Sequence, residues 1–158
     1  MEMYCADCGC LVERGVVLVP CEQAECCCRS LPTVAPMETM AVRIRTALNS
    51  RDMSAFRALI AEDAVWGEGG PDDPRTCHNR NDIISNYKRL LAEGARGTVT
   101  ETTTGPLGVV CEVELDWPDD ARDRRGPTIF QVFLVSDGLV ARIVGADDHD
   151  AAVMAVSA

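Results

Sequence analysis

Residues 109–117, Val-Val-Cys-Glu-Val-Glu-Leu-Asp-Trp, decide the fold class of this chain of 158 residues. The odd-numbered side chains of this stretch are all apolar, and three of the four even-numbered ones are acidic. Alternation with a period of two is typical of a strand that has one face in the core and one in solvent. Sheets with one exposed face are usually antiparallel, so the stretch predicts a strand of an antiparallel sheet.

Three more strands are expected around this one. Residues 98–104 are rich in β-branched side chains, and the run 129–135 is almost wholly apolar, as in the central strand of a sheet. Asp137-Gly138 is a hairpin signal, and the alternation after it predicts a last strand over 139–144. Together these stretches predict a four-stranded antiparallel meander.

The part of the chain before the meander has helical spacing. Apolar residues recur every three or four positions over 37–48, 53–60 and 83–91, which predicts three helices. Residues 64–68 predict one short strand between the second and third helices. The predicted fold class is α+β: a cone-shaped, curved antiparallel sheet wrapped around three helices, preceded by a small Cys-rich module.

Capping residues mark where the predicted helices begin. Asp52 precedes the second helix, and either Asn79 or Asn81 can cap the third. Asp147-Asp148-His149-Asp150 has the composition of a metal cluster. A simpler interpretation than a metal site is that these residues are the N-cap and acidic first turn of a short final helix over 149–156.

The first 28 residues contain seven of the nine cysteines. The uncharged segment 31–36 carries two prolines and suits a linker, so we expect a Cys-rich module over 1–32 and the α+β domain over 33–158. About 30 residues have too little core to fold without a staple, and zinc bound by four thiolates would supply one. Redox-active or cluster-binding thiols and an unliganded tail are the alternatives.

The expected zinc ligands come in two pairs. Cys5 and Cys8 have the C-x2-C-G form of a zinc knuckle. Cys21 and Cys26 supply the second pair, although the fourth ligand could equally be Cys27 or Cys28. Residues 11–19 between the pairs could form the small hairpin of a zinc ribbon.

Composition narrows the classes of partner. Fifteen Lys and Arg against 25 Asp and Glu give a net charge of −10. Nucleic acids and anionic membrane surfaces are therefore not expected partners. No apolar run is long enough for a membrane span, and the N-terminus has no basic leader, so we expect a cytoplasmic protein.

Four stretches of the α+β part suggest a family: RTALNSRD (45–52), FRALI (56–60), EDAVW (62–66) and HNRNDII (78–84). They resemble the nuclear transport factor 2-like superfamily, and within it the SnoaL-like proteins, over about residues 37–150. The resemblance implies a cone of sheet and helices around a buried apolar pocket. Members of this superfamily include ketosteroid isomerases, polyketide cyclases, epoxide hydrolases, ligand binders and dimerisation modules, so the fold alone does not give the function.

The resemblance also implies site residues. Isomerases of the superfamily keep a catalytic carboxylate just after the first strand, and this place falls on Glu68. Their oxyanion-binding tyrosine falls on Ile44 and their protonated acid near Gln131, so the isomerase arrangement is incomplete here. We expect Glu68 to act as a desolvated general base, with Gln131 or Tyr87 donating a hydrogen bond to a developing oxyanion.

The resemblance also predicts which residues line the pocket, which ligand it binds and which reaction it catalyses. We expect its wall to contain Ile44, Trp66, Ile129 and Phe133, with His78 as a further candidate. The expected ligand is an apolar small molecule, and the expected reaction is proton-transfer isomerisation or cyclisation of an apolar carbonyl compound. The alternative is a non-catalytic ligand-binding or dimerisation module with a zinc-stapled docking extension.

We also expect a homodimer. The predicted strands place several apolar side chains on the outer face of the sheet, where they would form a patch too large for a monomer to expose. These side chains are Val110, Val132, Leu134, Val140 and Val144.

The zinc hypothesis predicts one equivalent of Zn²⁺ per chain in protein purified without added metal, because two thiolate pairs complete one tetrahedral site. Elemental analysis measures the ratio. Changing Cys5 and Cys8 together to Ser should remove the metal, whereas Cys77→Ser and Cys111→Ser should retain it. Metal-free, monodisperse protein with an ordered N-terminus would contradict the hypothesis.

Overall fold

The structure is a computed structural model of the chain, and it describes residues 2–4, 10–13, 16–19, 36–70, 72–118 and 128–157. The chain divides into two compact units, Met1–Thr39 and Met40–Ala158. None of the helices in the described ranges is both long and apolar enough to cross a membrane.

The first unit contains a small antiparallel sheet with the strand order β1-β2-β3. Its strands are Glu2–Tyr4 (β1), Leu11–Glu13 (β2) and Val16–Val19 (β3). β2 and β3 lie in the segment that the sequence assigned to a hairpin, and they pair antiparallel. The predicted zinc ligands Cys5, Cys8, Cys21 and Cys26 lie outside the described residues.

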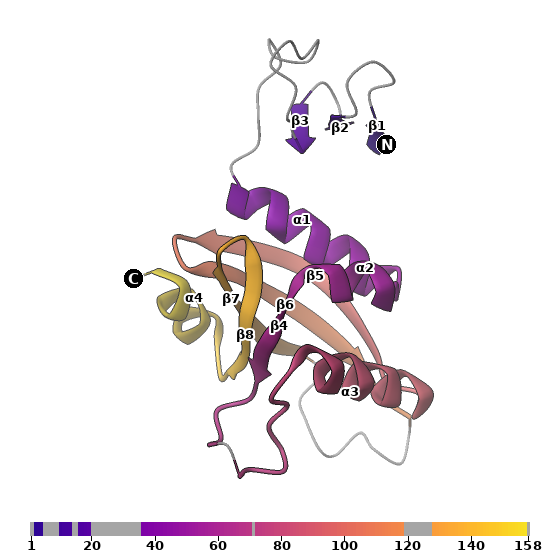
Figure 1. Cartoon of the computed structure of the whole chain (residues 1–158), viewed down its shortest axis with the longest axis vertical. Coiled ribbons are helices and arrows are strands. Elements are labelled where there is room, and N and C mark those ends of the chain that lie inside the picture. Colours follow the sequence, from indigo (N-terminus) through magenta and orange to yellow (C-terminus); the bar gives the residue numbers. More distant parts are fainter. Residues whose placement is uncertain are drawn as a thin grey trace. The chain divides into compact units, whose positions relative to one another are not determined.

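The second unit is built on a five-stranded sheet with the order β4-β8-β7-β6-β5 (Figure 1). The predicted meander is confirmed, since β5 to β8 pair antiparallel in chain order. The strands of this sheet are Ile60–Trp66 (β4), Arg96–Gly105 (β5), Gly108–Asp116 (β6), Thr128–Ser136 (β7) and Leu139–Ala146 (β8).

The prediction of an all-antiparallel sheet is wrong at its edge. β4 begins at Ile60, within the segment predicted as helix, and pairs in parallel with β8, where Ile60 is opposite Val140. The backbone N–H of Val140 also donates to the carbonyl of Leu59 (2.8 Å), directly after the preceding helix. Local patterns report hairpins between sequence neighbours, so they carry no signal for two strands that pair in parallel across such a long separation.

The described residues after the small sheet also contain four helices, of which the first begins at the end of the first unit. They are Pro36–Asn49 (α1), Met53–Ala58 (α2), Arg80–Ala92 (α3) and His149–Ser157 (α4). The cap of α3 is Asn79, whose Oδ1 accepts from the N–H of Asp82 (2.9 Å). Asp148 Oδ1 likewise accepts from the N–H of Ala151 (2.8 Å), so the acidic group at 147–150 is confirmed as the start of a final helix.

Helix α4 covers the outer face of the sheet, on the opposite side from α3 (Figure 1). Ala152 and Val156 of α4 pack with Val110 and Val132, and partly buried side chains of β7 and β8, including Leu134 and Val144, surround them. Helix α4 therefore covers most of the apolar patch predicted as a dimer face, and Leu134 and Val144 remain partly exposed. Val140 does not belong to this cluster and is buried opposite Ile60 of β4.

One side chain joins the end of α1 to the sheet. Asn49 Nδ2 donates to the carbonyl of Val99 in β5 (3.1 Å), and Asn49 Oδ1 accepts from the N–H of the same residue (2.8 Å). This double hydrogen bond stands where the β5–β6 register shifts between Val99 and Glu101, and it satisfies backbone groups of Val99 there.

Asn49→Ala should lower the free energy of unfolding by about 2 kcal/mol, because it leaves two partly buried backbone groups without a partner. Urea unfolding followed by circular dichroism measures the change. Asn81→Ala is the matched control: Asn81 is exposed, and its side chain makes no hydrogen bond in the described part of the chain. Equal stability of the two variants would contradict the role given to Asn49.

Candidate functional site

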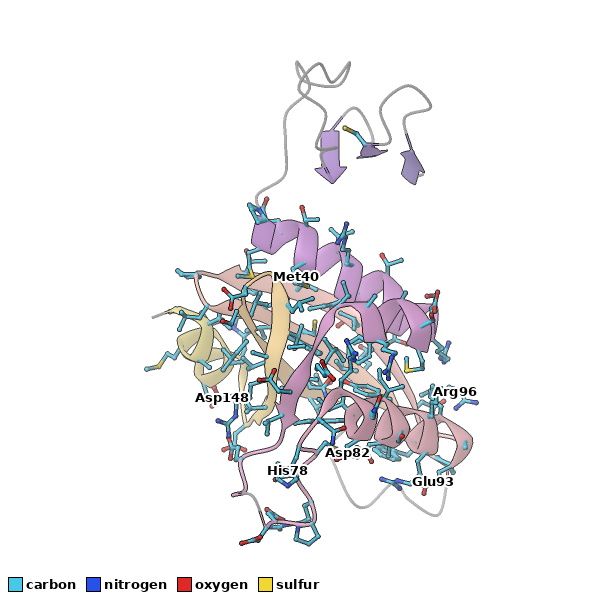
Figure 2. All side chains as sticks on the ribbon, viewed as in Figure 1. Met40, His78, Asp82, Glu93, Arg96 and Asp148 are labelled. Carbon is cyan, nitrogen blue, oxygen red and sulfur yellow. The ribbon has the colours of Figure 1, made fainter. Side chains whose placement is uncertain are left out.

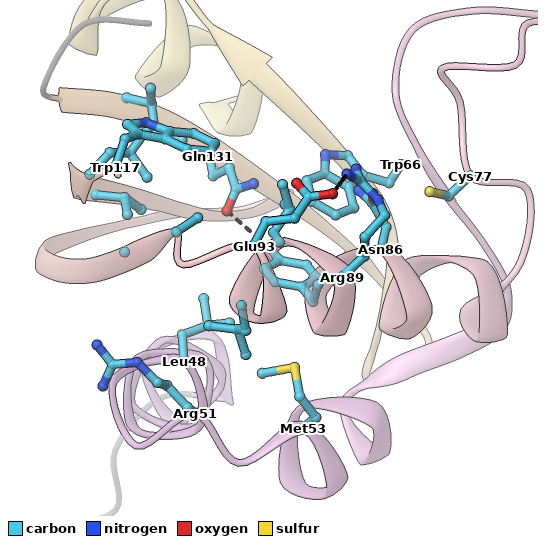
Figure 3. A pocket seen from close by; sticks show the side chains of 18 of the residues that line it. Leu48, Arg51, Met53, Trp66, Cys77, Asn86, Arg89, Glu93, Trp117 and Gln131 are labelled. Carbon is cyan, nitrogen blue, oxygen red and sulfur yellow. Dashed lines mark hydrogen bonds and ion pairs between the residues drawn. The ribbon is translucent and has the colours of Figure 1, made fainter. Parts of the chain in front are cut away.

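A cavity of about 910 Å³ lies between the inner face of the sheet, helix α3 and the ends of α1 and α2 (Figure 3). This volume lies within the usual range of small-molecule sites, about 300–1,000 Å³. Apolar side chains from several elements line it, and the principal ones are Leu48, Met53, Leu90, Leu91, Val99, Val113, Leu115 and Ile129.

A hydrogen-bonded pair of polar side chains forms part of the cavity wall. The hydroxyl of Tyr87 on α3 donates to Oε1 of Gln131 on β7 over 3.1 Å (Figure 3). The periodicity of the helix and of the strand explains why both residues face the cavity. Tyr87 is one helical turn beyond the buried Ile83 and Ile84, and Gln131 alternates with residues that pack against α4.

Aromatic contacts hold the Tyr87 ring in place. The Trp66 ring stacks on it with centroids 4.6 Å apart and planes 24° apart, and the Phe56 ring meets it edge-on at 4.9 Å. Trp66 is itself held by two backbone hydrogen bonds of 2.9 Å to Cys77 in the loop before α3. The Tyr87 ring is therefore held in position by side chains from two other elements, β4 and α2.

Burial keeps the titratable groups deep in this region neutral. Desolvation raises the pKa of Tyr87 far above its ordinary value, although the hydrogen bond to Gln131 acts in the opposite direction. Burial also raises the pKa of the Cys111 thiol to about 12, and burial together with the nearby Asp82 raises the pKa of Cys77. Tyr87 is thus a neutral hydrogen-bond donor at physiological pH, and neither thiol supplies a thiolate nucleophile.

Charged side chains also line the cavity. Three are the arginines Arg51, Arg75 and Arg89, and the fourth is Glu93. Arg89 Nη1 donates to Glu93 Oε1 (2.7 Å), and Arg89 Nη2 donates to Asn86 Oδ1 (2.8 Å).

The structure brings together four of the predicted site residues. Trp66, Tyr87, Ile129 and Gln131 all line the cavity. Ile44 and Phe133 are fully buried but belong to the core behind the wall, and the Phe56 ring stands 6.3 Å from that of Phe133.

Two predicted site residues lie elsewhere. His78 is exposed in the loop that leads into α3 (Figure 2). Glu68 is also exposed and does not line the cavity, contrary to the predicted location of a desolvated base. The chain leaves β4 at Gly67, where a φ of 128° turns it away from the direction of the strand, so Glu68 does not continue along the inner face.

The prediction of the site missed several wall residues, among them Arg51, Asn86, Glu93 and Trp117. For Trp117 a signal existed, because it is the last inward position of the alternation over 109–117. The indole N–H of Trp117 is buried and has no hydrogen-bond partner in the described structure. The other three come from helix ends and polar helix faces, for which the sequence pattern indicates solvent.

The described residues contain no cluster of three or more His, Cys, Asp or Glu side chains that could hold a metal ion. The cavity therefore offers hydrogen bonds, apolar surface and charge, and its described wall offers no metal centre. The zinc ligands predicted near the N-terminus are not among the residues to which this finding applies.

Comparisons with known proteins agree with this fold. The sequence profile of the SnoaL-like domain matches residues 41–143. No curated protein sequence matches the chain.

Solved structures with the same fold include a candidate polyketide cyclase from Sinorhizobium meliloti, which is 18% identical, with 72% of this chain and 95% of that chain covered and a TM-score of 0.52. A candidate ketosteroid isomerase from Kribbella flavida is 24% identical, with 72% and 80% covered and a TM-score of 0.52. Bal32a, from a soil-derived mobile gene cassette, is 20% identical, with 71% and 91% covered and a TM-score of 0.57. At these identities the likeness shows the fold alone. Through the profile match over most of its second unit, the chain belongs to the SnoaL-like domain family.

Proposed function

We propose that this protein binds an apolar carbonyl compound in the cavity, with the carbonyl oxygen at the Tyr87–Gln131 pair. The observation that carries the proposal is this pair of neutral polar groups in the wall of a largely apolar cavity. Because Gln131 Oε1 accepts from Tyr87, the amide nitrogen of Gln131 is directed to other partners and can donate to a carbonyl oxygen.

Proton transfer beside the bound carbonyl is the reaction class that we propose for this site. Neutral donors aimed at an oxygen stabilise the enolate that forms when a base removes the neighbouring proton. Solved proteins with this fold include a candidate polyketide cyclase and a candidate ketosteroid isomerase, whose names suggest chemistry of this kind. Glu93 is the carboxylate side chain among the wall residues, whereas Glu68 is the base that the family resemblance implies.

Two further expectations remain proposals. The cysteine spacing supports structural zinc at Cys5, Cys8, Cys21 and Cys26, where a closed four-thiolate site would stabilise the N-terminal segment without taking part in catalysis. A homodimer also remains a prediction, although α4 covers most of the outer face that suggested it.

Gln131→Leu should weaken binding of 2-acetylnaphthalene about tenfold, because it removes the hydrogen bond to the carbonyl. Binding of 2-ethylnaphthalene, which has no carbonyl, should be unchanged or slightly stronger. Tryptophan fluorescence reports both titrations, since Trp66 and Trp117 are the two tryptophans of the chain and both line the cavity. An equal loss of affinity for the two compounds would show that Gln131 does not recognise the carbonyl.

The proton-transfer proposal predicts exchange of the acetyl hydrogens of 2-acetylnaphthalene with D₂O, followed by NMR. We expect Glu93→Gln to slow the catalysed exchange by about 100-fold or more, and Glu68→Gln to leave it unchanged. The reverse result would identify Glu68 as the base. If wild-type protein gives no exchange above the buffer rate while binding the compound, the non-catalytic binding account holds.

A further inference from the structure

Position 97 is an inward-facing position of β5 that carries no side chain. Ala95, Gly97 and Val99 line the cavity, and the two residues between them are not part of its wall, as the alternation of a strand requires. Gly97 is paired with Leu115 of β6, which lines the cavity as well. A side chain at position 97 would therefore point into the cavity.

The backbone does not require glycine at this position. The φ of Gly97 lies outside the left-handed region, in contrast to the φ values of Gly67, Gly94 and Gly138. Glycine in the interior of a strand is unfavourable, because it loses conformational freedom on folding and has no side chain to pack. Such a glycine is typical of a place where another group approaches the backbone closely.

Packing within the protein explains only the first part of the space beside Gly97. A Cβ atom on Gly97 would lie 3.1 Å from Cγ1 of Val113 and 3.6 Å from Cδ2 of Leu115. The first distance is shorter than an ordinary van der Waals contact, so an alanine requires a small shift of Val113. Because all three residues line the cavity, the atoms of any longer side chain would occupy the cavity itself.

Gly97 lies far along the sheet from the proposed carbonyl site. Gln131 of β7 is paired with Cys111 of β6, whereas Gly97 of β5 is paired with Leu115 of β6. Cys111 and Leu115 are four positions apart on one strand, which corresponds to about 13 Å at the usual rise of about 3.3 Å per residue. One aromatic ring with an acetyl group is shorter than this distance, and two rings in line span it.

We infer that Gly97 determines the length of ligand that the cavity accepts, and that the ligand is an elongated apolar carbonyl compound whose far end lies against Gly97. The inference rests on the proposed binding of a carbonyl at the Tyr87–Gln131 pair. The body of the ligand lies along Ile129 and Val113, which are paired between the two ends and line the cavity. Burial of apolar surface at the far end adds affinity in proportion to its area.

The test compares acetophenone with 4-acetylbiphenyl by isothermal titration calorimetry with the full chain. The second ring of 4-acetylbiphenyl is in line with the first and extends toward Gly97, so wild-type protein should bind it at least tenfold more tightly than acetophenone. Gly97→Val should weaken the binding of 4-acetylbiphenyl about tenfold and leave that of acetophenone unchanged, because the added side chain fills only the far end of the cavity.

Two further variants separate ligand length from effects on folding. Gly97→Ala is a smaller change, and it should weaken 4-acetylbiphenyl about threefold with acetophenone unchanged. Thr98→Val alters the neighbouring exposed residue of β5, which is not part of the wall, so it should change neither affinity. Retained binding of acetophenone shows that a variant is folded. If Gly97→Val loses it, the result for Gly97→Ala decides.

Equal losses for the two probes in Gly97→Ala, or unchanged affinity of both position-97 variants for 4-acetylbiphenyl, would overturn the role of Gly97 and leave carbonyl binding standing. 4-Ethylbiphenyl, which has no carbonyl, tests the two proposals separately. If it binds wild-type protein as tightly as 4-acetylbiphenyl and is weakened by Gly97→Val, the carbonyl proposal fails and the role of Gly97 stands. Absence of binding by all three probes would overturn both.

Discussion

The register of β7 between β6 and β8 is the constraint on which the rest of the second unit depends. Val132 and its outward-facing neighbours pack under α4, while Gln131 and Ile129 face the cavity. Side chains alternate strictly along a strand, so a slip of one residue would bury the polar amide under α4 and turn apolar side chains toward the cavity. The packing of α4 on the outer face and the composition of the cavity wall therefore both depend on the register of β7.

Strand β7 also positions helices α2 and α3, through aromatic contacts. Phe133 of β7 contacts Phe56 of α2, and Phe56 in turn meets the Tyr87 ring of α3. Trp66 at the end of β4 closes this cluster by stacking on Tyr87. Aromatic rings cover large areas with few rotatable bonds, so a chain of ring contacts orients the elements that it joins. The hydroxyl of Tyr87 is directed at Gln131 as a result of this packing.

Burial determines which protonation states the polar groups around the cavity adopt. Burial raises the pKa of Tyr87 and of Cys111, so both remain protonated, and the glutamate on the wall is held by an arginine. The amide nitrogen of Gln131 is a neutral donor of the wall that makes no hydrogen bond with a described residue. This free donor is the basis for proposing a carbonyl ligand.

The sequence by itself determined the elements whose signals are local. The alternation over 109–117 predicted β6, the turn at Asp137-Gly138 predicted the β7–β8 hairpin, and the acidic group at 147–150 predicted the start of α4, because each depends on neighbouring residues. Tertiary structure alone decided what depends on distant segments: the parallel pairing of β4 with β8 and the composition of the cavity wall. Trp117 and Arg51 line one cavity from just after β6 and just after α1, and no pattern along the chain relates residues so far apart.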